Sequence, residues 1–377
     1  MAAVAANSQR ALRSLGSRIS STLLKASRYT DLPALYQAQL FRQLSSEFYN
    51  QLWREAAHNI GAEFERLEPG YICLSRGDLV TVVRGSEVMA DNHLTLDLMG
   101  NKSLTVQLLK RLECPIHDIA PFDASETREM GCFLHRQGGP IVVKPAYGTG
   151  GGAGVTTGVS DITALRKAVR SAARYCHTLV LQRHIPGASY RLLLLDGTLV
   201  DAVRRDPPVL IGNGTETVRK LIRRENRSRL NTRPISALHP IRVDQDCRNQ
   251  LRALGHSLNS VLGQGQVVEI KSVVNENAAS QNHSVRDSVH PTTVDICARV
   301  VRGLSIELAG IDVQCNDISR PLGADNGAIL EVNTTPGLHH HYLVSDRAKG
   351  IPVAQLILQR IFDTGRGAIA FPRRRER

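Results

Sequence analysis

The sequence lacks paired cysteines and long apolar runs. Its seven cysteines are odd in number and form no C-x-x-C pair, which excludes a disulfide framework and a zinc–cysteine site as organising features. This usage predicts reduced thiols in a cytoplasmic protein. No apolar run in the 377 residues approaches the roughly 18–20 residues of a membrane span, so no membrane partner is expected.

Aromatic residues are also scarce, at 4% of the chain, although the formal net charge is +12. Nucleic-acid-binding domains combine basic patches with stacking aromatics or groove-reading motifs. No such motif is present, so nucleic acid is not expected as a partner. Much of the positive charge lies at the two ends, because residues 1–30 contain no acid and residues 372–377 read Pro-Arg-Arg-Arg-Glu-Arg. Binding of nucleic acid by these tails is the alternative. A mitochondrial transit peptide also fits residues 1–30, but we favour a basic segment without a targeting role.

Alternating helical and strand patterns predict an α+β chain without internal repeats. Residues 34–58 have helical spacing, and a helix is predicted after Asp161, whose side chain can cap it. Asp196-Gly197 separates two strand-like runs, as in a β-hairpin. Residues 62–98 read as short strands between glycine turns. The predicted strands there are 71–74, 79–83 and 94–96.

Two oxygen-bearing side chains stand two residues apart in the β-prone run from Gly327 to Gly337. Because the side-chain period of a strand is 2, Glu331 and Asn333 point to the same face. Asp312 lies in a second strand-like run upstream. Carboxylate and amide oxygens suit a hard cation such as Mg²⁺, although a lone Glu-x-Asn is also typical of a solvated strand face. The three residues together predict a magnesium site that bridges nucleotide phosphates.

A glycine-rich loop from Gly148 to Gly154 follows a strand that ends near Lys144. The loop lacks the Gly-Lys-Ser/Thr ending of a P-loop, and Val155 continues as a strand rather than opening a dinucleotide-binding helix. Glycines between two strands let backbone N–H groups close over phosphates, and Lys144 can contact a phosphate as a point charge. A flexible turn is the alternative for the glycine run alone.

The strand that ends at Gln182 runs into Ile185-Pro186-Gly187, a hinge where backbone groups can pair with an adenine edge. Arg191 heads the next strand, and Arg204-Arg205 precede a rigid Pro-Pro turn. These arginines can offset the charge of a transferring phosphoryl group, or they can be solvated strand ends.

In this order the motifs resemble the ATP-grasp superfamily, and within it the ATP-grasp domain of cyanophycin synthetases. The likeness runs from about Asn101 to about residue 345. It rests on Asn101-Lys102-x-x-Thr105, Val142-Val143-Lys144-Pro145, the glycine loop, Ile185–Arg191, Arg204–Pro208, Gly310–Val313 and Glu331–Gly337. It implies an ATP-grasp fold, with two α+β lobes holding ATP between them after a small N-terminal α/β domain. The implied units are residues 1–33 (basic segment), 34–100 (N-terminal domain), 101–184 (first lobe), 185–365 (second lobe) and 366–377 (basic tail).

The resemblance also implies site roles. ATP would contact Lys102, Lys144, Gly150, Gly151, Gly152, Leu181, Gln182, Arg183, Ile185 and Ser189. Catalytic contacts would come from Arg191, Arg205 and Asn275. Asp312, Glu331 and Asn333 would hold Mg²⁺, with Mn²⁺ as an alternative. Ser189, Gln182 and Asn213 depart from the acids that many relatives carry at these positions.

The implied activity is that of an ATP-dependent carboxylate–amine ligase, which forms an amide on an amino acid or small peptide through an acyl phosphate. A kinase without ligation and a non-catalytic nucleotide-binding module are the alternatives. Cyanophycin synthetases also carry a C-terminal Mur-ligase-like domain that this sequence does not match, so a single ligation is expected. His339–His341 would orient or deprotonate the amine, or pack over the site. The expected partners are a small carboxylate and an amine, and self-association into a homo-oligomer stays open.

Overall fold

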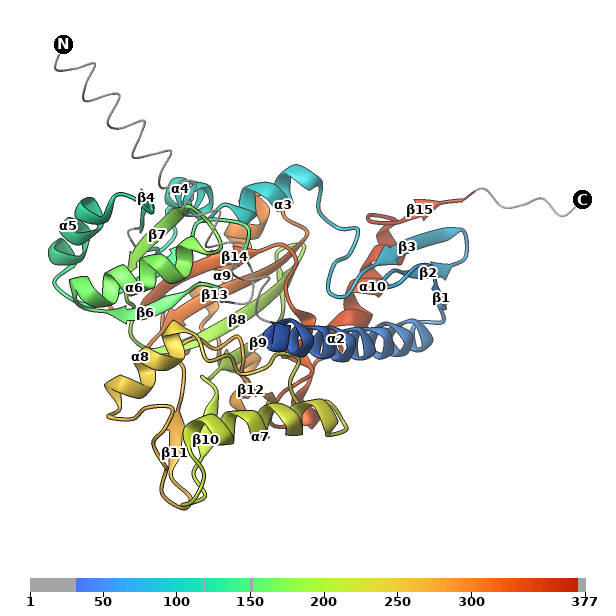
Figure 1. Ribbon diagram of the computed structural model, residues 1–377. Coiled ribbons are helices and arrows are strands. Elements are labelled where there is room, and N and C mark those ends of the chain that lie inside the picture. Colours follow the sequence, from blue (N-terminus) through green and yellow to red (C-terminus); the bar gives the residue numbers. More distant parts are fainter. Residues whose placement is uncertain (1–31, 118, 150–151, 372–377) are drawn as a thin grey trace, which may run out of the picture.

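Four antiparallel sheets organise the part of the chain that the computed structural model describes, residues 32–117, 119–149 and 152–371 (Figure 1). The basic segment before Leu32, the tail after Phe371 and the loop glycines Gly150 and Gly151 lie outside the described residues. All seven cysteines are described, and none of them forms a disulfide in this structure. None of the described helices has the length and apolarity needed to cross a bilayer.

The N-terminal unit is a long helix packed on a small sheet. The helix is α2 (Leu32–Asn59), and the sheet has the order β1 (Glu63–Arg66), β2 (Ile72–Arg76), β3 (Leu79–Val83) and β15 (Ile369–Ala370). The C-terminal helix α10 (Val353–Thr364) packs against α2 around the fully buried Trp53. The predicted helix at 34–58 and the strands at 71–74 and 79–83 are therefore confirmed.

The strand predicted at 94–96 is wrong. These residues lie in the helix α3 (His93–Gly100), whose N-cap Asn92 accepts a hydrogen bond from the backbone N–H of Thr95 at 3.0 Å. The three-residue run Leu94-Thr95-Leu96 is too short to distinguish a period of 2 from one of 3.6. The capping side chain decides the local structure here.

The first lobe is a sheet covered by helices on one face. The sheet order is β4 (Ile119–Asp123), β7 (Thr178–Arg183), β5 (Ile141–Pro145) and β6 (Thr156–Val159). Helices α5 (Thr127–Gln137) and α6 (Ile162–Ala173) cover this face. Helix α4 (Lys102–Arg111) instead buries Leu109 in the core of the second lobe. Asp161 caps α6 as predicted, accepting from Ala164 N at 2.8 Å, and the helix buries its apolar stripe against the sheet. The opposite face of the sheet is left to line a cavity.

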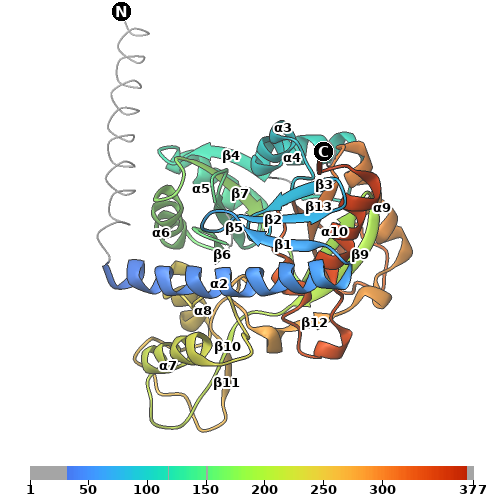
Figure 2. The same cartoon turned by 90° about the vertical axis from the view of Figure 1, so that its right-hand side faces the viewer.

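The second lobe is built on the sheet β12 (Asn282–Ser284), β9 (Thr198–Arg205), β8 (Ala188–Leu195), β13 (Leu308–Cys315) and β14 (Gly327–Asn333). Helix α9 (Pro291–Gly303) packs on one face of it. The other elements are α7 (Val218–Asn231), α8 (Gln245–Ala253), β10 (Val209–Ile211), β11 (Val267–Glu269) and the short 3₁₀ turns η2 (Ala279–Gln281), η3 (Arg286–Ser288), η4 (Leu338–His341) and η5 (Arg347–Lys349). The predicted hairpin turns at Asp196-Gly197, both with positive φ. Figure 2 shows α2 running between the N-terminal strands and α7.

Gly187 joins the two lobes under a tight steric limit. Its φ is +106°, and a Cβ built there would lie 2.3 Å from the carbonyl oxygen of Cys315 on β13. We expect Gly187→Ala to lower the free energy of unfolding by at least about 2 kcal/mol. The alanine would be strained at this positive φ, and its Cβ would push the backbone away from β13. Denaturant unfolding measures the loss. Gly255→Ala is the control, since Gly255 also has positive φ (+74°) but no atom within 4 Å of its Cβ position; equal losses in the two variants would contradict the steric account.

Candidate active site

Two cavities meet where β13 and β14 lie side by side. The inter-sheet cavity, of about 270 Å³, lies between the first-lobe strands β5 and β7 and the second-lobe strands β8, β13 and β14. The helix-side cavity, of about 790 Å³, lies between α2 and the segment from β14 to η4. Six residues line both cavities: Lys102, Thr149, Arg191, Asn275, Glu331 and Asn333. The shared residues mark a junction between the two spaces.

Most of the predicted site residues line the inter-sheet cavity. They are Lys102, Lys144, Gly152, Gln182, Arg183, Ile185, Ser189, Arg191, Arg205, Asn275, Asp312, Glu331 and Asn333. Leu181 is fully buried in the core of the first lobe and does not line it. Gly150 and Gly151 lie outside the described residues. The structure thus brings together side chains that are up to 231 positions apart, between Lys102 and Asn333. Their roles stay predictions.

The two carboxylates face each other across the strand pair. Asp312 on β13 pairs in register with Glu331 on β14, just before a bulge at Val313. The guanidinium of Arg191 holds Asp312 through two bonds, from Nε at 2.5 Å and from Nη2 at 2.9 Å. Lys102 Nζ lies 3.1 Å from Glu331 Oε1. Each carboxylate of the predicted metal site is therefore paired with a cation that was predicted to contact phosphate.

Asp312 is held in its ionised form. Burial raises the pKa of its carboxyl, but the charges of Arg191 and Arg205 outweigh burial and leave the pKa below its ordinary value. Burial and the nearby Arg191 lower the pKa of Arg205 to about 10, so this arginine also keeps its charge at neutral pH. The junction accordingly carries a compact set of opposite charges.

The donor set at the junction fits a hard cation. Asn333 Nδ2 lies 3.4 Å from Asp312 Oδ2 and 3.2 Å from the carbonyl of Gly310. A half-turn of this amide would present its oxygen beside the two carboxylates, giving the three oxygen donors that Mg²⁺ favours. Among the described residues, no cluster of three or more His, Cys, Asp or Glu could hold a metal. The predicted site depends on Asn333 as its third ligand.

Lys144 lies at the end of β5 and is buried. Its ammonium donates to Gln182 Oε1 at 2.8 Å. Burial lowers the pKa of Lys144 to about 8, against the attraction of Glu331. Gln182 stands where many relatives were expected to carry a glutamate, and its neutral amide orients the lysine without adding a full negative charge.

We expect the affinity for ATP to fall as the pH rises through about 8. Lys144 is charged below its pKa and neutral above it, so its attraction for phosphate is present at pH 7 and is lost at higher pH. Titration of a fluorescent ATP analogue between pH 7 and pH 9.5 measures this dependence. Lys144→Gln should bind weakly at every pH, and a variant that kept the wild-type pH dependence would contradict the assignment.

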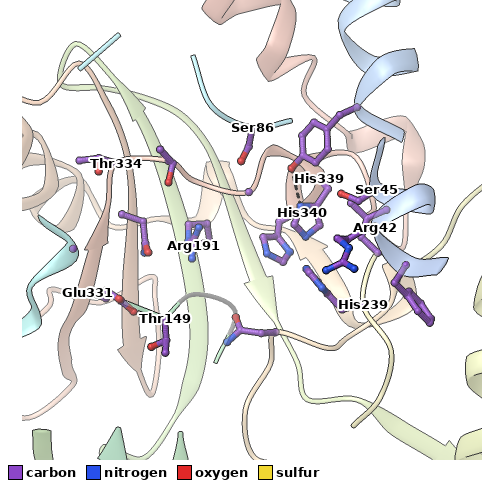
Figure 3. Close-up of a pocket in the computed structure, with 18 of the residues that line it drawn as sticks. Arg42, Ser45, Ser86, Thr149, Arg191, His239, Glu331, Thr334, His339 and His340 are labelled. Atoms are coloured by element: carbon purple, nitrogen blue, oxygen red, sulfur yellow. Dashed lines mark hydrogen bonds between the residues drawn. The ribbon is translucent and has the colours of Figure 1, made fainter. Parts of the chain in front are cut away.

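The three successive histidines take different positions. His341 is fully buried, with Nδ1 2.7 Å from Asp201 Oδ2, and lines neither cavity. His339 and His340 line the helix-side cavity, and His339 Nδ1 lies 3.0 Å from the Tyr49 hydroxyl (Figure 3). Burial lowers the pKa of His339 and of His340 well below the ordinary value, so both are neutral at neutral pH. His341 has the packing role, and the other two face the cavity.

A buried ion cluster fixes the loop that carries Asn275. Lys271 is fully buried between Asp244 (2.6 Å) and Glu276 (2.9 Å). Glu276 also accepts from Arg242 Nε at 2.7 Å. Arg205 Nη2 donates to Asn275 Oδ1 at 2.5 Å. The cluster thereby sets both the cavity wall and the position of Arg242 beside it.

Sequence reasoning missed the far wall of the helix-side cavity. This wall is lined by Arg42 and Ser45 of α2, Ser86, His239 and Arg242. The sequence did contain a signal that these α2 residues share one face. Spacings of four, three and four residues place on one stripe of the helix Ala38, Arg42, Ser45 and Tyr49. The stripe mixes small and polar residues and does not have the appearance of a core face.

Comparison with known proteins identifies relatives, although no family model matches the chain. Cyanophycin synthetase from Nostoc sp. is 32% identical over 228 residues, which cover 60% of this chain and 25% of that protein. Cyanophycin synthetase from Synechocystis sp. is 31% identical over 294 residues, covering 75% of this chain and 31% of that protein. This chain is similar in sequence to cyanophycin synthetases. The predicted resemblance is thus confirmed, and the chain spans between a quarter and a third of the length of these two relatives.

More distant likenesses reach other proteins. The glutathione biosynthesis bifunctional protein GshAB of Clostridium perfringens is 24% identical over 306 residues, covering 79% of this chain and 39% of that protein. Among solved structures, a bifunctional glutathione synthetase from Pasteurella multocida has a TM-score of 0.49 at 19% identity, over 81% of this chain and 42% of that chain. D-alanine–D-alanine ligase from Bacillus anthracis has a TM-score of 0.41 at 13% identity, over 72% of each chain. Both TM-scores are below 0.5.

Proposed function

We propose that this chain is an ATP-dependent carboxylate–amine ligase that forms an amide on an amino acid or small peptide. The observation that carries the proposal is the junction of the two cavities, where Asp312 and Glu331 are each paired with a cation that can take a phosphate. The sequence similarity to cyanophycin synthetases supports it. Residues 101–184 and 185–365 would act as the two ATP-grasp lobes, with ATP in the inter-sheet cavity.

Two steps account for the reaction. The carboxylate of the acid attacks the γ-phosphorus of ATP, the bond to the β–γ bridging oxygen breaks, and an acyl phosphate and ADP form. The amine then attacks the acyl carbon, a C–N bond replaces the C–O bond, inorganic phosphate leaves, and the amine nitrogen loses a proton. Phosphorylation supplies the leaving group that a free carboxylate lacks.

The ion pairs at the junction would change partners when ATP binds. The phosphates would attract Lys102 and Arg191 away from their present partners, and this would free Glu331 and Asp312 to act as ligands together with Asn333. A bound Mg²⁺ would supply neutralisation of phosphate charge. Arg205, which donates to Asn275 and lies 3.5 Å from Asp312, would remain to offset charge on the transferring group.

Two of the three departures from the acids of relatives, Asn213 and Ser189, bear on the alternative of a non-catalytic module, and the structure places them differently. Asn213 accepts from the backbone N–H groups of Thr215 and Glu216 and lines neither cavity, so it serves a turn rather than the site. Ser189 does line the inter-sheet cavity. A kinase needs only one further substrate, whereas the helix-side cavity of about 790 Å³ has room for an acid and an amine, which favours ligation.

A screen for ADP release over pairs of carboxylates and amines, with mass spectrometry of the products, tests the proposal. We expect one active pair that yields ADP and an amide in equal amounts. A stable phosphorylated product without an amide would indicate a kinase. Nucleotide binding without turnover for any pair would favour the non-catalytic module.

We also infer that the natural compartment is the reducing cytoplasm. The seven free cysteines support this inference, since five of them are buried (Cys114, Cys176, Cys247, Cys297 and Cys315) and none is paired.

A further inference from the structure

Tyr49 connects helix α2 to the histidine segment that follows β14. Its hydroxyl lies 3.0 Å from Nδ1 of His339, and Figure 3 marks this contact with a dashed line. Tyr49 is 6% exposed, and both residues line the helix-side cavity. The pair therefore joins a helix of the N-terminal unit to the space where the acid and the amine would meet.

The hydroxyl of Tyr49 is the donor in this hydrogen bond. Its oxygen accepts from the backbone N–H groups of His339 and Leu338 and from the hydroxyl of Ser86. Burial raises the pKa of Tyr49 to about 12 against the effect of these three donors, so the phenol keeps its proton at neutral pH. Because other donors surround the oxygen, the single phenolic proton is left for Nδ1 of His339.

The direction of this bond determines the tautomer of His339. Burial, and then the nearby His239 and Arg205, lower the pKa of His339 well below its ordinary value, so the ring is neutral at neutral pH. A neutral imidazole carries one N–H, and the nitrogen that accepts a hydrogen bond is the other one. The proton is therefore on Nε2, which has no acceptor among the described residues. His339 offers the cavity a donor and no free lone pair.

Neighbouring groups fix the orientation of the His339 ring. The centroid of the His340 ring lies 4.0 Å away, and the ring of Tyr49 meets it edge-on at 6.3 Å. A Cβ added to Gly337 would lie only 2.7 Å from Cε1 of His339, so the ring packs directly on the backbone of the turn that follows β14. The Nε2–H group consequently has a fixed place, as a preorganised donor requires.

Amide formation needs a donor of this kind. When the amine nitrogen attacks the acyl carbon, the carbonyl π electrons move to the acyl oxygen, which becomes an oxyanion before phosphate leaves. Arg205 and Arg191 are close enough to His339 to lower its pKa, and these arginines are the ones proposed to offset phosphate charge. A neutral N–H group beside them can stabilise the oxyanion without competing with the arginines for phosphate.

We propose that Tyr49 holds His339 as the Nε2–H tautomer and that His339 donates this hydrogen bond to the acyl oxygen when the amine attacks the acyl phosphate. His339 is then a catalytic residue, and Tyr49 is a positioning residue that acts through it. The inference rests on the proposed ligase function and extends it to the second step. In that step a C–N bond forms, the C–O bond to phosphate breaks, and the departing phosphate takes the proton that the amine nitrogen loses. His339 keeps its own proton throughout.

The first test measures the tautomer and needs no substrate. The full chain is labelled with ¹⁵N-histidine, and two-bond ¹H–¹⁵N correlation spectra are recorded at neutral pH, with His339 assigned from the signals that His339→Leu lacks. We expect a protonated Nε2 and an unprotonated Nδ1 in the wild type. Tyr49→Phe removes the hydroxyl and keeps the ring, so it should give a mixture of both tautomers. An Nδ1–H tautomer in the wild type, or an unchanged tautomer in Tyr49→Phe, would refute the role of Tyr49.

The second test is kinetic and uses the pair found active in the screen for ADP release. His339→Leu should lower kcat for amide formation by about 100–1,000-fold, the usual effect of losing one oxyanion donor, with little change in KM. His339→Gln keeps an N–H donor and should recover part of kcat. Tyr49→Phe should lower kcat by about 3–10-fold, because only a fraction of the molecules would carry the donor. In rapid-quench experiments on His339→Leu, ADP should form in a burst ahead of the amide, since the first step does not use this donor.

Tyr342→Phe is the matched control. Tyr342 packs against the same core cluster as Tyr49, and its hydroxyl accepts from the backbone N–H of Ala354 at 2.9 Å, but it lines neither cavity. The control variant also loses a hydrogen-bonded hydroxyl. It should leave both the His339 signals and kcat unchanged.

Several kinetic results would overturn the inference. A kcat for His339→Leu close to that of the wild type, or an effect confined to KM, would refute the contact with the oxyanion while leaving the ligase function intact. Equal losses of kcat in Tyr49→Phe and Tyr342→Phe would show that a missing hydroxyl in this core, and not the tautomer, lowers the rate. If no pair released ADP, the ligase function and the catalytic role of His339 would both be refuted, whereas the spectra would still decide whether Tyr49 fixes the tautomer.

Discussion

Glu331→Gln is expected to lower turnover by about 1,000-fold with little change in stability. Glu331 lines both cavities and is the carboxylate nearest to Lys102, at 3.1 Å. Glutamine keeps the shape and removes the charge that the proposed metal and phosphate chemistry needs. Because the side chain is 31% exposed, the ion pair itself contributes at most about 1 kcal/mol to folding. Steady-state ADP release and a thermal melt measure the two effects.

Glu216→Gln provides the matched control. Glu216 is 30% exposed and forms an ion pair with Arg224 at 2.5 Å, but it lines neither cavity. The Glu216→Gln variant should lose as little stability as the Glu331→Gln variant, and it should retain full turnover. A Glu331→Gln enzyme with turnover within tenfold of the wild type would remove Glu331 from the proposed site.

Arg191→Met is expected to lower the free energy of unfolding by about 3–5 kcal/mol and to abolish turnover. Arg191 and Asp312 are both largely buried, with side-chain exposures of 7% and 15%, and share two hydrogen bonds. Loss of the arginine leaves a buried carboxylate with only Arg205, 3.5 Å away, to offset it. In the variant the pKa of Asp312 should rise, so the deficit should be largest at neutral pH and should shrink as the pH falls and the carboxyl becomes protonated.

The double variant Arg191→Met/Asp312→Asn separates charge from packing. Removing the carboxylate that has lost its partner should restore most of the lost stability. Turnover should stay absent, because the proposed roles of Arg191 and Asp312 are both lost. Denaturant unfolding at pH 5 and pH 7 for the wild type, both single variants and the double variant completes the cycle. A double variant as unstable as Arg191→Met would show that packing around Arg191, and not the ion pair, determines the loss.

Local signals predicted much of the inter-sheet cavity. Glu331, Asn333 and Asp312 lie on regular strands, where a period of 2 fixes which side chains share a face. Lys144 and Gln182 lie on the neighbouring antiparallel strands β5 and β7, where the register pairs Gln182 with Val142 and Lys144 with Val180. The order of the motifs along the chain does not contain this register, so their hydrogen bond could not be predicted from spacing. The strand predicted at 94–96 was wrong because this run is short. Its structure is decided by the N-cap Asn92 rather than by the periodicity of its side chains.

The helix-side cavity could not be predicted in the same way. Its wall joins Arg42 to Arg242 and His339, residues about 200 and 300 positions away, through packing of α2 against α7 and α10. No spacing rule connects these positions, and Arg42 alone has the appearance of a solvated residue on a helix. Only the tertiary arrangement shows that three separate segments enclose one space.

In the proposed reaction, a carboxylate of the substrate becomes an acyl phosphate. Labelling both oxygens of the acid's reacting carboxylate with ¹⁸O, for the pair found active in the screen, tests it most directly by mass spectrometry of the released phosphate. We expect one ¹⁸O atom in inorganic phosphate for each amide formed, because the oxygen that attacks the γ-phosphorus leaves with it. Unlabelled phosphate, or ¹⁸O recovered in AMP, would contradict the formation of an acyl phosphate.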